Sequence, residues 1–174
     1  MSIALYISLL AIFTALTTVA TIVFVIPIPS TSGFFNLGDA LVMLSGLLLG
    51  PVGGLIAGGV GSALGDVALG YFGFAPFTLV IKGCEGLVVG LISRRSKGAQ
   101  TPRPWDFLAV ILAGVVMLVG YFAAEVFFLG LSPEAALVEM VAANSIQVIV
   151  GAAVTILVGP MLRAFLREYV PEIL

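Results

Sequence analysis

The stretch that decides the fold is Asn36–Gly90, NLGDALVMLSGLLLGPVGGLIAGGVGSALGDVALGYFGFAPFTLVIKGCEGLVVG. Nearly all of it is apolar or glycine. It nevertheless contains two Leu-Gly-Asp triplets, at 37–39 and 64–66, and a Lys82…Glu85 pair. Ionisable side chains are costly in so apolar a segment and are usually paired or functional there. We therefore interpret these charges as marks of one pocket.

The composition of the 174-residue chain indicates that lipid is its main solvent. Hydrophobic residues make up 61% of the chain and charged residues only 9%, whereas a soluble domain carries about 25% charged residues. One domain is expected at this length, so we predict a single membrane domain over residues 1–174 with no soluble domain.

Several function classes are disfavoured by what the sequence lacks. There is no histidine and only one cysteine, Cys84, so no transition-metal site or disulfide is expected. No basic patch with interleaved aromatic residues indicates nucleic-acid binding. No arrangement of nucleophile and base indicates an enzyme, and no cofactor is predicted.

Proline and glycine turns divide the chain into apolar segments close to the about 20 residues that a spanning helix needs. The predicted helices are Ile3–Ile26, Asn36–Leu49, Val52–Leu69, Phe77–Ser93, Asp106–Leu129 and Pro133–Leu166. The second has an apolar core only about 20 Å long, so whether it crosses fully stays open. The pattern predicts an all-α, polytopic membrane protein with six transmembrane helices in one bundle.

Basic residues indicate the orientation, because cytoplasmic loops carry an excess of lysine and arginine. They form two clusters, one between the fourth and fifth helices and one at the end of the sixth: Arg94, Arg95, Lys97 and Arg103; Arg163 and Arg167. Six spans place both clusters on one side. We therefore expect both termini to be cytoplasmic.

The intramembrane polar residues all fall in the outer half of the predicted bundle, on the side opposite the basic clusters. The candidate substrate-binding residues are Asn36, Asp39, Asp66, Tyr71, Lys82, Glu85, Tyr121, Glu125, Asn144 and Gln147. A channel would need polar groups through its full depth, but the inner halves are apolar. The distribution predicts a cup that is open to the outside and has a sealed floor.

Simpler interpretations of individual members stay open. Lys82 and Glu85, three residues apart, could only neutralise each other, and Asp39 could only stabilise the start of its helix. The pair Asn144 and Gln147 could join helices by hydrogen bonds. Two further carboxylates, Glu134 and Glu139, lie near a loop and are expected to be solvated.

Aromatic residues surround the mouth of this cup and could also serve as interface anchors: Phe34, Phe35, Tyr71, Phe72, Phe74, Phe77, Tyr121 and Phe122. Aromatic walls with a few convergent polar groups suit a small flat heterocycle. Acidic groups outnumber Lys82, so we expect a neutral or weakly basic ring rather than a phosphorylated ligand.

Several segments resemble the substrate-binding S components of energy-coupling factor (ECF) vitamin transporters: NLGDALVML, GPVGGLIAGGVGSALGDVALGY, APFTLVIKGCEGLVVGLI and NSIQVIVGAAV. They are most similar to the group for riboflavin or for hydroxymethylpyrimidine and related thiamine or pyridoxine precursors. The resemblance implies a six-helix bundle in a prokaryotic plasma membrane that binds one vitamin from outside. It also implies partners, namely a transmembrane T component and two cytoplasmic ATPases.

Two further features follow from the resemblance. The family docks through small residues on the first helix, which Ala11 and Ala15 match; the sequence alone also allows this pair to pack inside the fold. The segment Pro27–Phe35 corresponds to a loop that closes over the ligand. The identity of the vitamin stays open, and an oligomeric channel or secondary carrier for a small neutral or cationic solute, working without ATPases, is the alternative function.

Overall fold

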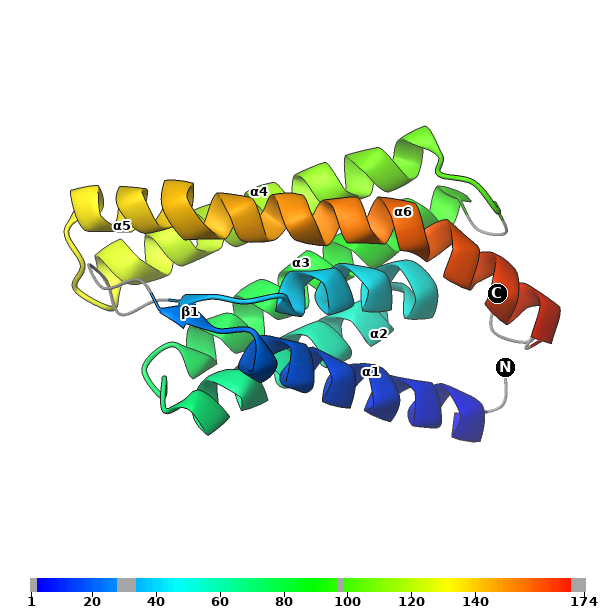
Figure 1. The fold of residues 1–174 in the computed structure, drawn as a ribbon, viewed down its shortest axis with the longest axis horizontal. Coiled ribbons are helices and arrows are strands. Elements are labelled where there is room, and N and C mark those ends of the chain that lie inside the picture. The colour runs from blue at the N-terminus through cyan, green and yellow to red at the C-terminus, as the bar shows by residue number, and fades with distance from the viewer. Residues whose placement is uncertain (1–2, 28–33, 97–98, 170–174) are drawn as a thin grey trace.

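The computed structural model describes residues 3–27, 34–96 and 99–169, and nearly all of them are helical (Figure 1). The α-helices are α1 (Ile3–Val23), α2 (Gly38–Leu69), α3 (Ala75–Ser93), α4 (Pro104–Phe127), α5 (Pro133–Glu139) and α6 (Ser145–Tyr169). A 3₁₀ turn, η1 (Arg94–Ser96), follows α3, and a π-helical turn, η2 (Met140–Asn144), joins α5 to α6. The all-helical class is confirmed.

Two short strands, β1 (Ile26–Pro27) and β2 (Phe34–Phe35), pair antiparallel between α1 and α2. Pro27, Phe34 and Phe35 are the described residues of the segment Pro27–Phe35, which is predicted to close over a ligand. Residues 28–33 of that segment lie outside the described residues. The pairing of Pro27 with Phe34 brings Phe34 to the entrance of α2.

The number of spans is confirmed only in part. Among the described residues, five helical stretches are long and apolar enough to cross a membrane: Ile3–Val23, Gly38–Leu69, Ala75–Ser96, Pro104–Phe127 and Pro133–Glu168. The predicted second and third helices belong to one element, α2, so six separate spans remain a prediction.

Helix α2 is nevertheless a hairpin, because its chain direction reverses at Gly50. This residue has φ 79° and ψ −172°, a conformation that glycine adopts readily and other residues avoid. The two arms pack against each other, since a methyl group on Gly54 would meet the Cα of Gly46 and one on Gly58 would meet Val42. The first arm, 38–49, is about 18 Å long, shorter than the about 30 Å of a hydrocarbon core.

Close helix contacts build the centre of the bundle. A methyl group on Gly86 of α3 would overlap the backbone of Gly54 in α2, so these helices touch backbone to backbone. On the other side of α2, the hydroxyl of Thr18 in α1 donates a hydrogen bond of 2.8 Å to the carbonyl of Gly61. Small residues allow such approaches between helices in lipid.

The bundle has two distinct ends (Figure 1). The first residue of α1, the last residue of α6 and the connection from α3 to α4 lie at one end, here called the terminal end. The start of α2, the connection from α2 to α3 and helix α5 lie at the other, here called the pocket end. This arrangement fits the predicted sidedness, although the cytoplasmic position of the termini stays a prediction.

One of the basic residues used to predict the orientation is buried. Arg163 is only 1% exposed and forms an ion pair of 3.1 Å with Asp106. It also donates to the carbonyl oxygen of Ser96, at 3.2 Å. Tertiary packing therefore holds Arg163 inside the bundle, and the cytoplasmic side that it was used to indicate stays a prediction. Of the other basic residues, Lys97 lies outside the described residues.

Candidate functional site

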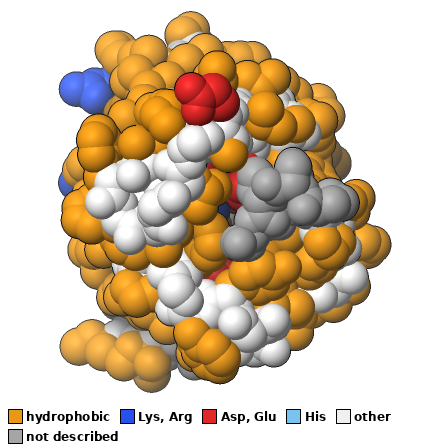
Figure 2. All heavy atoms as spheres, turned by 90° about the vertical axis from the view of Figure 1, so that its left-hand side faces the viewer, with side chains coloured by type: hydrophobic (Ala, Val, Ile, Leu, Met, Phe, Trp, Pro, Cys, Tyr) orange, Lys and Arg blue, Asp and Glu red, His pale blue; other side chains and the backbone are white. Residues whose placement is uncertain are grey.

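A pocket opens at the pocket end, where hydrophobic side chains surround a recess that exposes acidic and basic groups (Figure 2). Its walls come from every major helix: Thr21, Phe34, Asn36, Ser62, Asp66, Phe74, Thr78, Lys82, Tyr121, Glu139, Asn144 and Gln147. The cavity measures ≈ 30 Å³, room for about one water molecule. A ring can therefore enter only if lining side chains move aside.

Lys82 lies at the centre of the charges. It is 2% exposed and forms ion pairs with Asp39, on the first turn of α2, and with Glu85, at 3.1 Å on its own helix. Lys82 and Glu85 therefore do form the ion pair that the simpler interpretation expected, but they form it together with Asp39. Asp39 adds a second acidic side chain, so two carboxyl groups meet one cation in this cluster.

A hydrogen-bond frame connects the start of α2 to α6. The side-chain amide of Gln147 donates to Asp39 at 3.1 Å, and its carbonyl oxygen accepts from the backbone N–H of Asn36 at 2.9 Å. The side chain of Asn36 in turn accepts from the N–H of Gly38, at 2.7 Å. Asn36, Asp39 and Gln147 therefore support one another, as the helix-joining interpretation of Gln147 expected.

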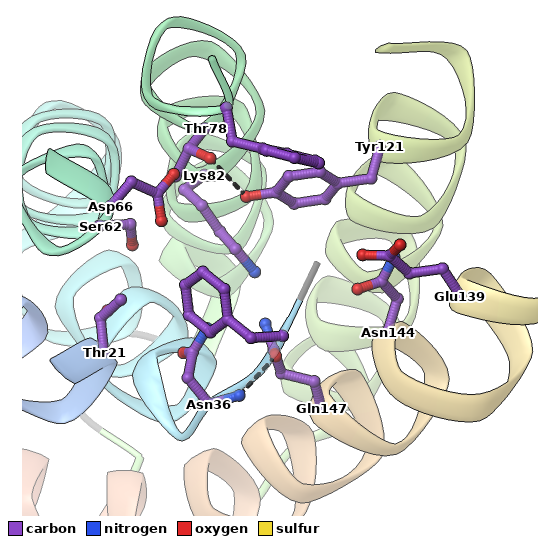
Figure 3. A pocket seen from close by; sticks show the side chains of 12 residues that line it. Thr21, Asn36, Ser62, Asp66, Thr78, Lys82, Tyr121, Glu139, Asn144 and Gln147 are labelled. Atoms are coloured by element: carbon purple, nitrogen blue, oxygen red, sulfur yellow. Dashed lines mark hydrogen bonds between the residues drawn. The ribbon is translucent and has the colours of Figure 1, made fainter. Parts of the chain in front are cut away.

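Across the cavity, Tyr121 and Thr78 form a second polar contact. The Tyr121 hydroxyl donates to the Thr78 hydroxyl oxygen at 2.9 Å, and the ammonium of Lys82 lies 5.6 Å from the centre of the Tyr121 ring. This distance is suitable for a cation–π interaction. The ring of Tyr121 thus helps to hold Lys82 at the pocket wall (Figure 3).

Ser62, Asp66 and Asn144 each bring to the pocket a polar atom that has no hydrogen-bond partner among the described residues. These atoms are Oγ of Ser62, Oδ2 of Asp66 and Nδ2 of Asn144, all on side chains at most 5% exposed. A buried polar group without a partner costs about 1–3 kcal/mol, so native proteins rarely keep several together without a reason. Ser62 and Asp66 lie on one wall and Asn144 on the opposite wall (Figure 3).

Four of the predicted site residues do not line the cavity. Asp39 and Glu85 pair with Lys82 instead, and Glu125 is fully buried in α4 with both carboxylate oxygens lacking a partner among the described residues. Tyr71 borders a shallow groove outside the pocket and packs against Phe34, with ring centres 4.6 Å apart. Its contribution to the pocket is therefore indirect.

Glu139 is the most informative residue that the sequence prediction missed. It was expected to be solvated near a loop, but it is 3% exposed and lines the cavity. Thr21, Ser62 and Thr78 were also absent from the predicted site. Ser62 could have been found, because it lies one helical turn from Asp66 on the same face; an isolated threonine in an apolar helix carries no such signal.

The comparisons with known proteins cover nearly the whole chain. Residues 4–164 match the family described as ECF-type riboflavin transporter, S component. An uncharacterized protein of Pyrococcus woesei is 40% identical over 157 residues, which cover 90% of this chain and 98% of that protein. The thiamine precursor transporter HmpT of Lactococcus lactis subsp. cremoris is 31% identical over 157 residues, covering 90% of this chain and 86% of HmpT.

Proposed function

This chain belongs to the family of ECF-type riboflavin transporter S components, and we propose that it captures a small water-soluble vitamin or vitamin precursor from outside the cell at its pocket end. Because it belongs to this family, the chain is a multi-pass plasma-membrane protein of a prokaryote, with a role in vitamin uptake rather than catalysis. The substrate and the assembly with energising subunits are the proposed parts.

The observation that carries the proposal is the set of unpartnered polar atoms around the cavity. Ser62, Asp66 and Asn144 each present a buried atom to the same space. A ligand with hydrogen-bonding groups on two edges would satisfy both walls. Phe34 and Phe74 supply apolar surface for the faces of a ring, which is the usual composition of a small-molecule site.

Charge and size restrict the candidates, which are hydroxymethylpyrimidine, pyridoxine, thiamine and riboflavin-like heterocycles. Lys82 is already neutralised by two carboxylates, while Asp66 and Glu139 add negative charge to the walls, so a phosphorylated ligand would be repelled. A cavity of ≈ 30 Å³ requires less rearrangement for a single ring than for a three-ring flavin. The likeness to a thiamine precursor transporter also supports a single-ring precursor.

Calorimetry on the purified protein tests the binding role. We expect one of hydroxymethylpyrimidine, pyridoxine, thiamine or riboflavin to bind, and Asp66→Asn to weaken that binding by at least about tenfold through loss of a charged acceptor. Glu134→Gln is the matched control, because Glu134 is exposed at the start of α5. If none of the four compounds binds, the proposed substrate class is wrong.

We further propose that α1 docks onto a T component that carries two ATPases. Ala11 and Ala15 are exposed on α1, whereas Thr17 and Thr21 on the opposite face are buried against α2. Internal packing therefore does not explain the small side chains of this pair. Their small size would allow a partner helix to approach closely.

Uptake measurements in cells test this docking surface. Ala11→Val and Ala15→Val should impair uptake and co-purification with the T component while leaving ligand affinity unchanged. Ala153→Val, an exposed position on α6, is the matched control and should not affect uptake. Transport by this chain alone in liposomes would contradict the docking proposal and favour the self-contained carrier.

A further inference from the structure

We propose that Glu139 and Asn144 form a subsite for an amidine-like edge, meaning a ring nitrogen next to an exocyclic amine, as found in aminopyrimidines. This inference rests on the proposed binding function and specifies its substrate class. It starts from two side chains at most 5% exposed that line the same cavity and face it from the same wall (Figure 3).

The π-helical turn η2 is what brings these two side chains together. In a regular α-helix, residues five positions apart point about 140° away from each other. In η2, the backbone N–H of Ser145 bonds to the carbonyl of Met140, five residues earlier, and the Ser145 hydroxyl donates to the same oxygen at 2.7 Å. Bonding across five residues brings Glu139 and Asn144 toward one face, and such turns occur often at functional sites.

The pair presents a donor next to an acceptor. Nδ2 of Asn144 is a buried donor without a partner among the described residues. An ionised Glu139 carboxylate can only accept hydrogen bonds. An aminopyrimidine edge is complementary, because its ring nitrogen accepts from the Asn144 amide and its amine donates to Glu139. In the same orientation, the deaminated ring would set its carbonyl oxygen against the carboxylate and its ring N–H against the Asn144 donor.

On the opposite wall, Asp66 also accepts, but its neighbour Ser62 can both donate and accept. That wall therefore discriminates less sharply between an amine and a carbonyl.

Calorimetry with two matched probes tests the subsite, namely hydroxymethylpyrimidine and its deaminated analogue, in which a carbonyl replaces the amine. The unmodified protein should prefer the amine by at least about tenfold. In Glu139→Gln the new amide can donate to a carbonyl, so the preference should fall by at least about tenfold. Asn144→Asp removes the donor and should weaken binding of the aminopyrimidine further.

Controls separate this inference from the proposed function. Glu134→Gln should keep both affinities, and the thermal midpoint of each variant checks that it is folded. If the protein binds riboflavin or pyridoxine but not the aminopyrimidine, the subsite is overturned while the vitamin-binding role stands. Unchanged preference in both Glu139→Gln and Asn144→Asp would overturn it equally. Binding of no heterocycle at all would overturn the proposed function itself.

Discussion

Buried cations at the two ends of the bundle meet carboxylates in opposite ways. At the terminal end, Arg163 pairs with Asp106 at 3.1 Å and donates to the carbonyl of Ser96, while the second oxygen of Asp106 accepts from the N–H of Arg103 at 2.9 Å. At the pocket end, Lys82 pairs with two carboxylates. Their remaining oxygens, Oδ2 of Asp39 and Oε1 of Glu85, have no partner among the described residues.

The comparison distinguishes an ion pair whose carboxylate oxygens both have partners from a cluster in which two carboxyl oxygens lack one. In the terminal cluster, Arg163 and Asp106, one positive charge balances one negative charge. Backbone carbonyl oxygens of the loop accept further hydrogen bonds from the guanidinium. In the pocket cluster, Lys82, Asp39 and Glu85, two acidic side chains meet one cation, and each of them keeps one oxygen without a partner among the described residues. Buried polar groups are normally satisfied, so the pocket cluster is the less complete of the two.

The largest effect should come from breaking the terminal cluster. Arg163→Met leaves Asp106 buried without its cation, which should lower the free energy of unfolding by about 3–5 kcal/mol. Chemical denaturation in detergent measures this loss. Adding Asp106→Leu should restore part of the stability, because removing both charges costs less than removing one. A loss below about 1 kcal/mol would mean that the pair behaves as a surface pair.

An intermediate effect is expected at the pocket cluster. Lys82→Met leaves Asp39 and Glu85 uncompensated, but the adjoining cavity admits water, so we expect a loss of about 1–3 kcal/mol. Ligand affinity should fall as well, because Lys82 lines the cavity. The double variant with Glu85→Gln should recover stability without recovering affinity. Full recovery of affinity would assign Lys82 a purely structural role.

The smallest effect on stability should come from Ser62→Ala. Its hydroxyl has no partner to lose among the described residues, so the free energy of unfolding should stay within about 0.5 kcal/mol, while ligand affinity falls. Thr18→Val is the contrasting variant, since the Thr18 hydroxyl bonds α1 to Gly61. It should cost about 1 kcal/mol and leave affinity unchanged. If the two variants behave alike, the distinction between completed and incomplete polar groups fails.

Part of the candidate site could be predicted because a polar residue in an apolar helix is a local signal. Lys82, Asp66 and Asn144 stand out by composition alone, and the spacing of the helices places them at one end. The aromatic mouth was predicted less well. Phe34, Phe74 and Tyr121 line the cavity, whereas Phe72 is 67% exposed and does not.

Other members depend on contacts that no local pattern reports. Glu139 faces the cavity because η2 adds a residue to one helical turn, which changes the face that Glu139 occupies. Arg163 is buried because Asp106, 57 residues away in the sequence, meets it across the bundle. Asp39 reaches Lys82 across 43 residues, so its participation in the ion pair could not be read from its position at a helix start.

The sequence by itself determined that lipid is the main solvent of the chain, that the fold is helical and that the chain turns at Gly50. These features follow from composition and from the backbone preferences of glycine and proline. The sequence also determined which end of each helix carries polar groups, because depth in the membrane follows position along the chain. Only the tertiary structure decided which of those groups meet and which stay open to the cavity. That outcome depends on the rotation of each helix against its neighbours, which is set by packing contacts such as Gly54 against Gly86.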